Sequence, residues 1–215
     1  MARPVFDHAD FLDAALVLVA ERGPSAATIA AVTERLRAPT GSFYHRFPSR
    51  DALLGELWLK TVLAFQQGIE VALTAGDGLA AALHTPIWVR EHLDEGCLLL
   101  LYHRDDFVQG DWPQKLQQEV AAHTRRARGS LENFARNTFG SDGPDEIRRA
   151  QFILAEVPVA AVRQHLRRRE PPPPIVDDLI RAAYLAVIGA NANSRTKQRA
   201  IAKAESSRLK IRGGR

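Results

Sequence analysis

The chain has 215 residues, of which 46% are hydrophobic, enough for two modest helical units or one elongated unit with a sizeable core. Its single cysteine excludes an intrachain disulfide framework and fits a reducing cytosol, and no apolar run is long enough for a signal peptide or a membrane span. The formal charge of +4 comes from residues 194–215, which hold eight Lys or Arg and one Glu (+7), so the remainder carries −3 and overall basicity is no evidence for DNA binding.

The first helical pattern begins near the N-terminus. Apolar residues recur at helical spacing from Phe11 to Ala20, and Gly23 followed by Pro24 ends this helix. Thr28 is a suitable N-cap for a second helix that runs through Leu36.

The third helix is short and polar. Pro39 suits its first position, because a proline lacks the N–H that would be unsatisfied there. Between Pro39 and Phe47, the residues Thr, Ser, Tyr, His and Arg accompany only two large apolar side chains, Phe43 and Phe47. Such a helix holds a core poorly, whereas its hydroxyls and cations suit the phosphates and base edges of a DNA groove. With Ser49 as the cap of a long fourth helix, the pattern predicts a helix-turn-helix module on a stalk.

Here the sequence resembles the TetR family of bacterial transcriptional regulators, over roughly residues 8–57. The matching residues occur in the family's order: Ala14, Ala15, Leu18, Glu21, Arg22, Gly23, Thr28, Val32, Gly41, Ser42, Phe43, Tyr44, Phe47, Ser49, Arg50, Leu53 and Leu54. Two positions depart from the family pattern. Arg37 stands where the turn between the DNA-reading helices usually has glycine, and Pro39 stands where the reading helix usually starts with serine. An arginine with positive φ costs some stability, while its charge offers an added phosphate contact.

The resemblance implies the DNA contacts residue by residue. The predicted DNA-binding set is Thr28, Arg37, Pro39, Thr40, Ser42, Phe43, Tyr44, His45 and Arg50. Within it, we expect Tyr44, His45 and Arg50 chiefly at phosphates. Thr40 and Ser42 are expected at base edges, and Pro39 offers only an apolar contact, for example to a thymine methyl.

Convincing strands are scarce in the rest of the chain, where helical patterns continue. The fourth helix runs from Arg50 to the region of Leu73, and Gly76-Asp77-Gly78 breaks it. Further helical patterns cover residues 79–93, 97–102, 113–139, 144–168 and 175–192, with loops at 104–111 and 140–143 and a stiff break at the prolines 171–174. Pro158 is expected to kink or split the helix that contains it.

Large or amphipathic side chains beyond residue 50 are candidates for an effector pocket. Each alone is more typical of a core, but buried indole N–H, phenol and imidazole groups need partners, which a pocket supplies. The resemblance implies a small-molecule inducer pocket in this region, and a largely apolar ligand is expected because no cation cluster is evident. The fourth helix is the expected lever between this pocket and the DNA. The candidate residues are Trp58, Phe65, Trp88, Tyr102, His103, Phe107, Trp112 and Phe152.

Two late helices, around 145–168 and 175–192, are apolar over more surface than one core needs. A lone helix-turn-helix buries too little DNA surface for useful specificity, and dimers that read two half-sites about 34 Å apart are the usual solution. Members of the resembled family dimerise through their two C-terminal helices, which match these patterns in position. We expect a homodimer with a four-helix interface that includes Ile153, Val157, Ala161, Ile180, Tyr184 and Val187.

Signals for catalysis, for a metal site and for a cofactor are weak. On a helix, His92 and His103 would point away from the face of Cys97. His84 and His92 would lie about 12 Å apart along a helix, too far to share one ion. The sequence has no Gly-rich phosphate loop and no nucleophile elbow. We expect a protein that is not an enzyme.

These patterns predict an all-α protein in three parts. Residues 1–48 form a three-helix helix-turn-helix DNA-binding domain, residues 49–193 a larger C-terminal helical ligand-binding and dimerisation domain, and residues 194–215 a basic solvated tail or an auxiliary phosphate-binding arm. The expected function is that of a cytoplasmic repressor, which binds palindromic double-stranded operator DNA as a homodimer and is released by a small, largely apolar molecule. The alternative is a helical architectural protein whose basic tail drives nonspecific DNA binding without a ligand switch.

Overall fold

Helices make up the fold, which confirms the all-α prediction. The computed structural model describes residues 6–107 and 113–190, and no strand occurs in these two ranges. No helix within them is both long and apolar enough to span a membrane. The predictions for Trp112 and for the tail 194–215 fall outside the described residues.

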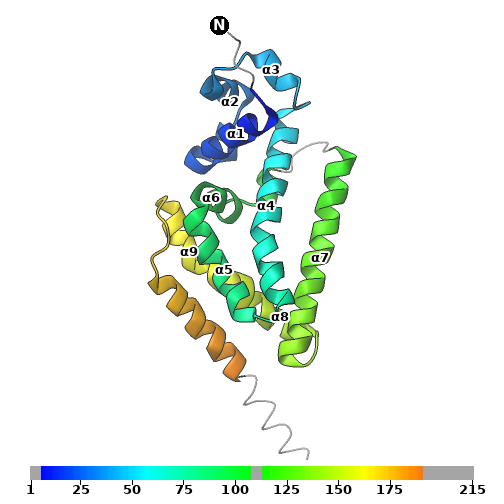
Figure 1. Ribbon diagram of the computed structural model, residues 1–215, viewed down its shortest axis with the longest axis vertical. Helices are drawn as coiled ribbons and strands as arrows, with labels where there is room; N and C mark the ends of the chain where they lie inside the picture. Colours follow the sequence, from blue (N-terminus) through cyan, green and yellow to red (C-terminus); the bar gives the residue numbers. More distant parts are fainter. Residues whose placement is uncertain (1–5, 108–112, 191–215) are drawn as a thin grey trace, which may run out of the picture.

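Three short helices gather at one end of an elongated molecule (Figure 1). They are α1 (His8–Arg22), α2 (Ile29–Leu36) and α3 (Thr40–Tyr44), and α4 (Arg50–Thr74) runs from them through the body. Two predicted N-caps are confirmed, because Thr28 Oγ1 accepts the N–H of Ala31 and Ser49 Oγ accepts that of Ala52, both at 3.1 Å. Pro39 differs from the prediction, since it caps α3 in an extended conformation and does not occupy the first helical position.

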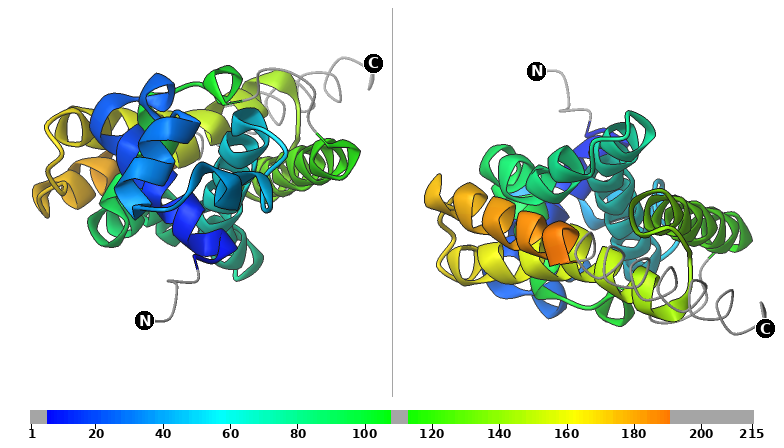
Figure 2. Two further views of the ribbon diagram at one scale, coloured as in Figure 1. Left: turned by 90° about the horizontal axis from the view of Figure 1, so that it is seen from above. Right: turned by 90° about the horizontal axis from the view of Figure 1, so that it is seen from below.

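The body packs on both sides of α4. It consists of α5 (Gly78–Glu91), α6 (Leu93–Leu101), α7 (Gln114–Phe139), α8 (Pro144–Gln151), α9 (Val157–Arg167) and a last described helix over residues 175–190. In Figure 1, α7 lies on one side of α4, and α5, α6 and α9 lie on the other. Figure 2 shows the last described helix beside α5 and the α8–α9 segment. The predicted breaks are confirmed, with Asp77 capping α5 and Pro144 opening α8.

Pro158 interrupts the long helical pattern of the late region. A π-helical turn, Phe152–Glu156, joins α8 to α9, and Pro158 is the second residue of α9. Proline has no N–H, and its ring clashes with the carbonyl four residues earlier, which distorts a regular α-helix. Pro86 is accommodated inside α5, whereas Pro158 follows a π-helical turn. The predicted kink is therefore present as a wider helical turn.

The core under α1–α3 does not stop at residue 48, where the sequence placed a domain boundary. It contains apolar residues of α4, including the fully buried Leu53 and Leu54, and two residues of the body, Leu98 and Phe107. A second core fills the body around Trp88, Val89, Cys97, Ile153, Val162, Leu166 and Ile180. The three-helix module of α1–α3 and the body therefore share α4 and the interface of α1 with α6.

One arginine fixes the start of the last described helix. Arg90 of α5 donates to both carboxylate oxygens of Asp177, at 3.0 and 2.6 Å. The same guanidinium donates to the carbonyls of Pro172 and Pro173, at 2.8 and 3.3 Å. Side-chain exposure is only 27% for Arg90 and 26% for Asp177, so this bidentate pair is better shielded than a surface ion pair.

Removal of Arg90 and removal of Asp177 should lower the stability of the protein by different amounts. Arg90→Ala is expected to lower the free energy of unfolding by about 2 kcal/mol, because it leaves Asp177 and two carbonyls without their donor. Asp177→Ala should cost about half as much, since Arg90 keeps both proline carbonyls. Urea unfolding of the two variants measures the difference, and equal losses would contradict it.

Candidate functional site

The short helix α3 has one buried and one open face. Phe43 is fully buried and Phe47 is 1% exposed, and their rings meet Phe11 edge-on with centroids 5.9 and 6.3 Å apart. This confirms that Phe43 and Phe47 attach the helix to the module. It also corrects the predicted contact set, because a fully buried Phe43 has no side-chain surface left for DNA.

The open face of α3 carries the side chains that the sequence assigned to DNA. Tyr44 is 58% exposed, and Pro39, Thr40 and His45 are also exposed. Ser42 is half-buried, and its carbonyl oxygen accepts a hydrogen bond from Arg46. The surface that DNA can reach is therefore built from Pro39, Thr40, Tyr44 and His45, with Ser42 at its edge.

Gly41 lies on this open face as well. A Cβ added there would meet no atom within 4 Å, so nothing in the protein itself requires a glycine at this position. Glycine in a helix costs about 1 kcal/mol relative to alanine. Gly41 therefore leaves the backbone of the open face accessible to the surface of a partner.

The turn between α2 and α3 contains the predicted strain. Arg37 has φ 53° and ψ 36°, a left-handed conformation that costs a non-glycine residue about 1 kcal/mol. Its N–H donates to the carbonyl of Glu34 at 2.9 Å, and its side chain is exposed. Arg37 therefore has a positive φ at the position where the family usually has glycine. It precedes the first residue of α3 by three residues.

Arg50 has a structural role that the sequence did not predict. Its Nε donates to the carbonyl of Ala27 at 2.9 Å and its Nη2 to that of Pro24 at 2.6 Å. Its Nη1 lies 3.5 Å from Asp51. The guanidinium ties the turn before α2 to the start of α4, and the expected phosphate contact of Arg50 stays a prediction.

The predicted site set did not include Arg46. Arg46 donates to the carbonyl oxygens of Ser42 and Phe6, and its guanidinium carbon lies 5.5 Å from the centroid of the Phe11 ring. The Thr28 hydroxyl oxygen accepts a hydrogen bond from the N–H of Ala31 at the N-terminus of α2. A contact of Thr28 with DNA stays a prediction.

The predicted effector residues do not form one pocket. Phe65 and Trp88 are buried in a stack of rings with His84 and His92, in which neighbouring centroids are 4.9 to 5.4 Å apart. These ring contacts pack Phe65 of α4 against His84 and Trp88 of α5, so both aromatics belong to the body core.

The other candidates lie elsewhere. Phe107 is 1% exposed and packs with Tyr102 in the core of the DNA-binding module. Trp58 lies under the guanidinium of Arg104, and Phe152 is 42% exposed on the surface. His103 is exposed after the end of α6. The expectation of a single aromatic pocket is therefore wrong, because these side chains serve two separate cores, the surface and a separate cavity that Tyr102 and His103 help to line.

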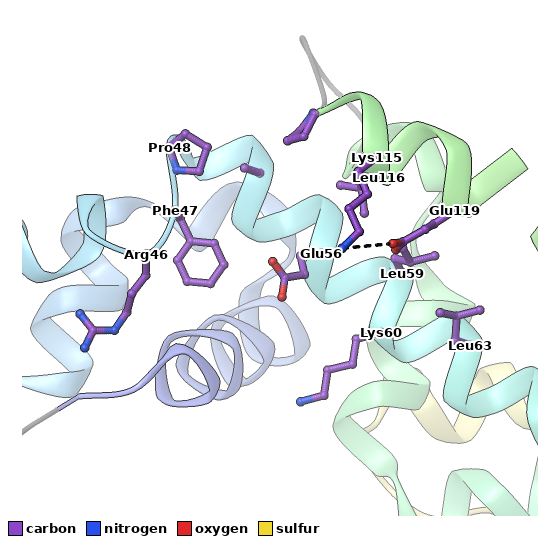
Figure 3. A pocket seen from close by; sticks show the side chains of 12 residues that line it. Arg46, Phe47, Pro48, Glu56, Leu59, Lys60, Leu63, Lys115, Leu116 and Glu119 are labelled. Carbon is purple, nitrogen blue, oxygen red and sulfur yellow. Dashed lines mark ion pairs between the residues drawn. The ribbon is translucent and has the colours of Figure 1, made fainter.

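An open groove of about 400 Å³ lies between α4 and the start of α7 (Figure 3). Its apolar lining consists of Phe47, Pro48, Ala52, Leu59, Leu63, Pro113 and Leu116, and its charged lining of Arg46, Glu56, Lys60, Lys115 and Glu119. Lys115 and Glu119 pair across 4.0 Å on the α7 wall. The groove borders the half of α4 nearest to α3. Phe47, which lies between the two helices and anchors α3, is part of the groove lining.

The predicted dimer residues are largely internal to the protomer. Ile153 and Ile180 are each 1% exposed in the core of the body, and the others (Val157, Ala161, Tyr184 and Val187) are half-buried against it. Exposed apolar side chains occur on other faces of the same segments. On the last described helix these are Ile175, Leu179 and Leu185, at 57%, 61% and 55% exposure.

The described residues contain no cluster of three or more His, Cys, Asp or Glu placed to hold a metal ion. Cys97 is fully buried in the body core, with its Sγ 3.6 Å from the carbonyl of Leu166. Burial raises the pKa of this thiol above its ordinary value, which disfavours the nucleophilic thiolate.

Comparison with known proteins agrees with this geometry. Residues 11–57 match the sequence model of the family described as bacterial regulatory proteins, tetR family. No curated protein sequence matches the chain.

Solved structures share the fold over most of the chain. A TetR-like transcriptional regulator from Rhodococcus sp. RHA1 has a TM-score of 0.64 and 18% identity, covering 87% of this chain and 100% of its own. The fatty acid degradation regulator FadR from Bacillus halodurans has a TM-score of 0.61 and 13% identity, with coverages of 85% and 98%. FadR from Bacillus subtilis, solved in complex with stearoyl-CoA, has a TM-score of 0.60 and 13% identity, with the same coverages.

Substitution of Gly41 distinguishes a role in DNA contact from a role in the stability of α3. Gly41→Ala should raise the free energy of unfolding by up to about 1 kcal/mol, because alanine favours the helix and meets no neighbour. The same change should weaken DNA binding, since the methyl group stands on the open face. Thermal unfolding and DNA titration of the variant test both parts, and unchanged DNA affinity would remove Gly41 from the contact surface.

A half-buried and a buried histidine should make stability depend on pH. Partial burial lowers the pKa of His84, against the opposing effect of its hydrogen bond to the Phe65 carbonyl, and burial also lowers the pKa of His123. In the unfolded chain both take up a proton near pH 6.5, whereas the folded protein resists protonation to lower pH. Their contribution is therefore complete above about pH 6.5 and is lost as pH falls towards the folded-state pKa values.

Glutamine variants isolate this effect, because glutamine does not titrate and keeps an amide donor. His84→Gln and His123→Gln should each flatten the dependence of the free energy of unfolding on pH between 7 and 5. Denaturant titrations at several pH values measure the slope. A wild-type slope in both variants would assign the pH dependence to other groups.

Proposed function

We propose that this protein, which carries a TetR-family DNA-binding segment on the fold of TetR-like regulators, is an effector-controlled repressor that binds a palindromic operator as a homodimer. One observation carries the proposal. The exposed residues Thr40, Gly41, Tyr44 and His45 of α3 and its cap form a polar face at the free end of the molecule, while the opposite face is fixed by buried phenylalanines. A helix held this way can enter a major groove without losing its own packing.

The exposed apolar residues of the last described helix support a dimer. Ile175, Leu179 and Leu185 recur at intervals that place them on one side of the helix, with the exposed Ala182 and Ala186 between them. The opposite side, with Val176 and Ile180, packs into the protomer core. A helix that is apolar on both sides has one face left for a second copy.

The groove between α4 and α7 supports an effector site. Its lining is mainly apolar, and it flanks the first half of α4, which begins next to the reading helix. Here the two helices are joined by a small cluster, in which only Leu59, Val62 and Val120 are buried. An apolar ligand that enters the groove would separate α7 from α4 at low cost in packing and would move the lever proposed for the switch.

The ligand class follows from this lining. A largely apolar molecule suits the groove, and the charges at its rim would meet a polar head group. Since FadR from Bacillus subtilis was solved with stearoyl-CoA, long-chain acyl-CoAs are the first effectors to test.

Specific DNA binding is the primary test of the proposed function. Footprinting on DNA upstream of the chain's own gene should show a protected palindrome, with an affinity at least about 10³-fold above that for random DNA. Weak, strongly salt-dependent binding without a preferred site would instead favour the architectural alternative.

The dimer can be tested without disturbing the protomer core. Leu179→Asp with Leu185→Asp should yield a folded monomer, because both side chains are more than half exposed. Val71→Asp, at a 65% exposed residue near the end of α4, is the matched control. Sedimentation at micromolar concentration should show a dimer for wild type and the control only, and a wild-type monomer would refute the interface.

Effector coupling can be measured in both directions. Stearoyl-CoA should weaken operator binding by about 1–3 kcal/mol, and operator DNA should weaken stearoyl-CoA binding by the same factor. Leu63→Trp, at a 36% exposed groove residue, should fill the groove and abolish the effect. Val71→Trp adds the same ring to α4 outside the groove and should behave as wild type. Equal ligand affinities with and without operator would leave no switch.

A further inference from the structure

A second cavity, of about 280 Å³, lies on the other side of the molecule between the end of α6 and α9. It is lined by Leu99, Leu100, Leu101, Tyr102, His103, Val159, Arg163 and Arg167. Most of the exposed lining is polar, and α6, Tyr102 and Val159 contribute a smaller apolar part. Tyr102 and His103 were among the predicted effector residues. The arginines come from a helix some sixty residues further along the chain than Tyr102, and the sequence alone gave no sign that these side chains meet.

The two arginines are available to a ligand. Arg163 and Arg167 are four residues apart and therefore lie on one face of α9. Neither guanidinium forms a hydrogen bond or an ion pair with any of the residues that the structure describes. Neighbouring arginines are engaged, since Arg169 pairs with Asp94 at 2.7 Å and Arg90 with Asp177 at 2.6 Å.

If these arginines had a purely structural role, their guanidinium groups would form hydrogen bonds within the protein. The last carbonyl groups of α6, including those of Leu99 to Leu101, have no partner within their own helix, and cations near a helix C-terminus are favourable. Within the described ranges, however, neither Arg163 nor Arg167 donates to these carbonyls. Asp106, four residues after Tyr102, accepts the backbone N–H of His103 at 2.8 Å.

We propose that this cavity binds a small organic anion, a carboxylate or a phosphate ester with a short apolar body. Two guanidinium forks on one helix face can each donate to a pair of oxygens of a carboxylate or a phosphate. The leucines of α6 and Val159 receive the apolar body. The cavity is distinct from the α4–α7 groove, with which it shares no residue.

The site is placed to influence DNA binding, a consequence that rests on the proposed function. Tyr102 lines the cavity and also packs against Gly23 at the end of α1, where a Cβ would come within 3.3 Å of its hydroxyl. Gly23 has φ 88°, and the next residue, Pro24, accepts a hydrogen bond from Arg50 at the start of α4. An anion that repositions Tyr102 acts on the turn that holds the reading head.

Binding is tested with the full chain in the absence of DNA. Isothermal titration with hexanoate and with hexyl phosphate should show one site per chain, and the anion that binds more tightly identifies the preferred head group. The uncharged 1-hexanol should bind at least about tenfold more weakly, equivalent to about 1.4 kcal/mol. Equal binding of hexanol, or no binding of either anion, would overturn the proposal.

Charge-removing variants locate the site. Arg163→Gln and Arg167→Gln should each weaken anion binding about tenfold or more, and the double variant should abolish it. Arg168→Gln removes the same charge from an exposed neighbour that does not line the cavity, and it should bind as wild type. Anion binding by the double variant at wild-type strength would refute the assignment.

A separate measurement addresses regulation. The anion that binds should change operator affinity in wild type and leave it unchanged in the double variant. No change in wild type would refute the coupling. Because binding is measured without DNA, a chain that fails to recognise an operator would disprove the proposed function and still give a clear answer on the anion site.

Discussion

The packing of Phe43 and Phe47 against Phe11 is the contact on which the DNA-binding surface depends. A helix of five residues has too few internal hydrogen bonds to be stable alone, so α3 exists because its aromatic side chains are buried in the module. Arg46 adds hydrogen bonds to the carbonyls of Ser42 and Phe6. With one face fixed in this way, the polar face of α3 is free for a partner.

The same core connects the reading head to the body. Leu53 and Leu54 of α4 belong to it, and so does Leu98 of α6. Arg50 ties the turn before α2 to the start of α4 through two backbone carbonyls. Any ligand that shifts α4 or α6 must therefore act on the orientation of α3, because packed cores transmit displacement and do not absorb it.

The apolar side chains of the last described helix serve two purposes, the protomer core and the proposed dimer interface. Val176 and Ile180 complete the protomer core, and Arg90 holds the start of their helix to α5. The outward residues, Leu179 and Leu185, are left for a second copy in the proposed dimer. The wide apolar stripe read from the sequence is thus divided between folding and the proposed assembly.

The sequence alone determined the features that depend on local chemistry. The all-α fold, the caps at Thr28 and Ser49 and the distortion before Pro158 all follow from interactions within a few residues. Helical spacing also identified Phe43 and Phe47 as anchors. The family match over residues 11–57 then confirmed the resemblance.

Only the tertiary structure decided which side chains meet. Phe65 and Trp88 turned out to fill the space between α4 and α5, while Phe107 joined the core of the DNA-binding module. Ile180 proved internal although its neighbour Leu179 is exposed, a difference that depends on how the helix is rotated against α5 and the α8–α9 segment. Arg50 bonds to carbonyls more than twenty residues away, and Arg163 faces the end of α6. Such contacts are set by how helices pack, which hydrophobic periodicity does not specify.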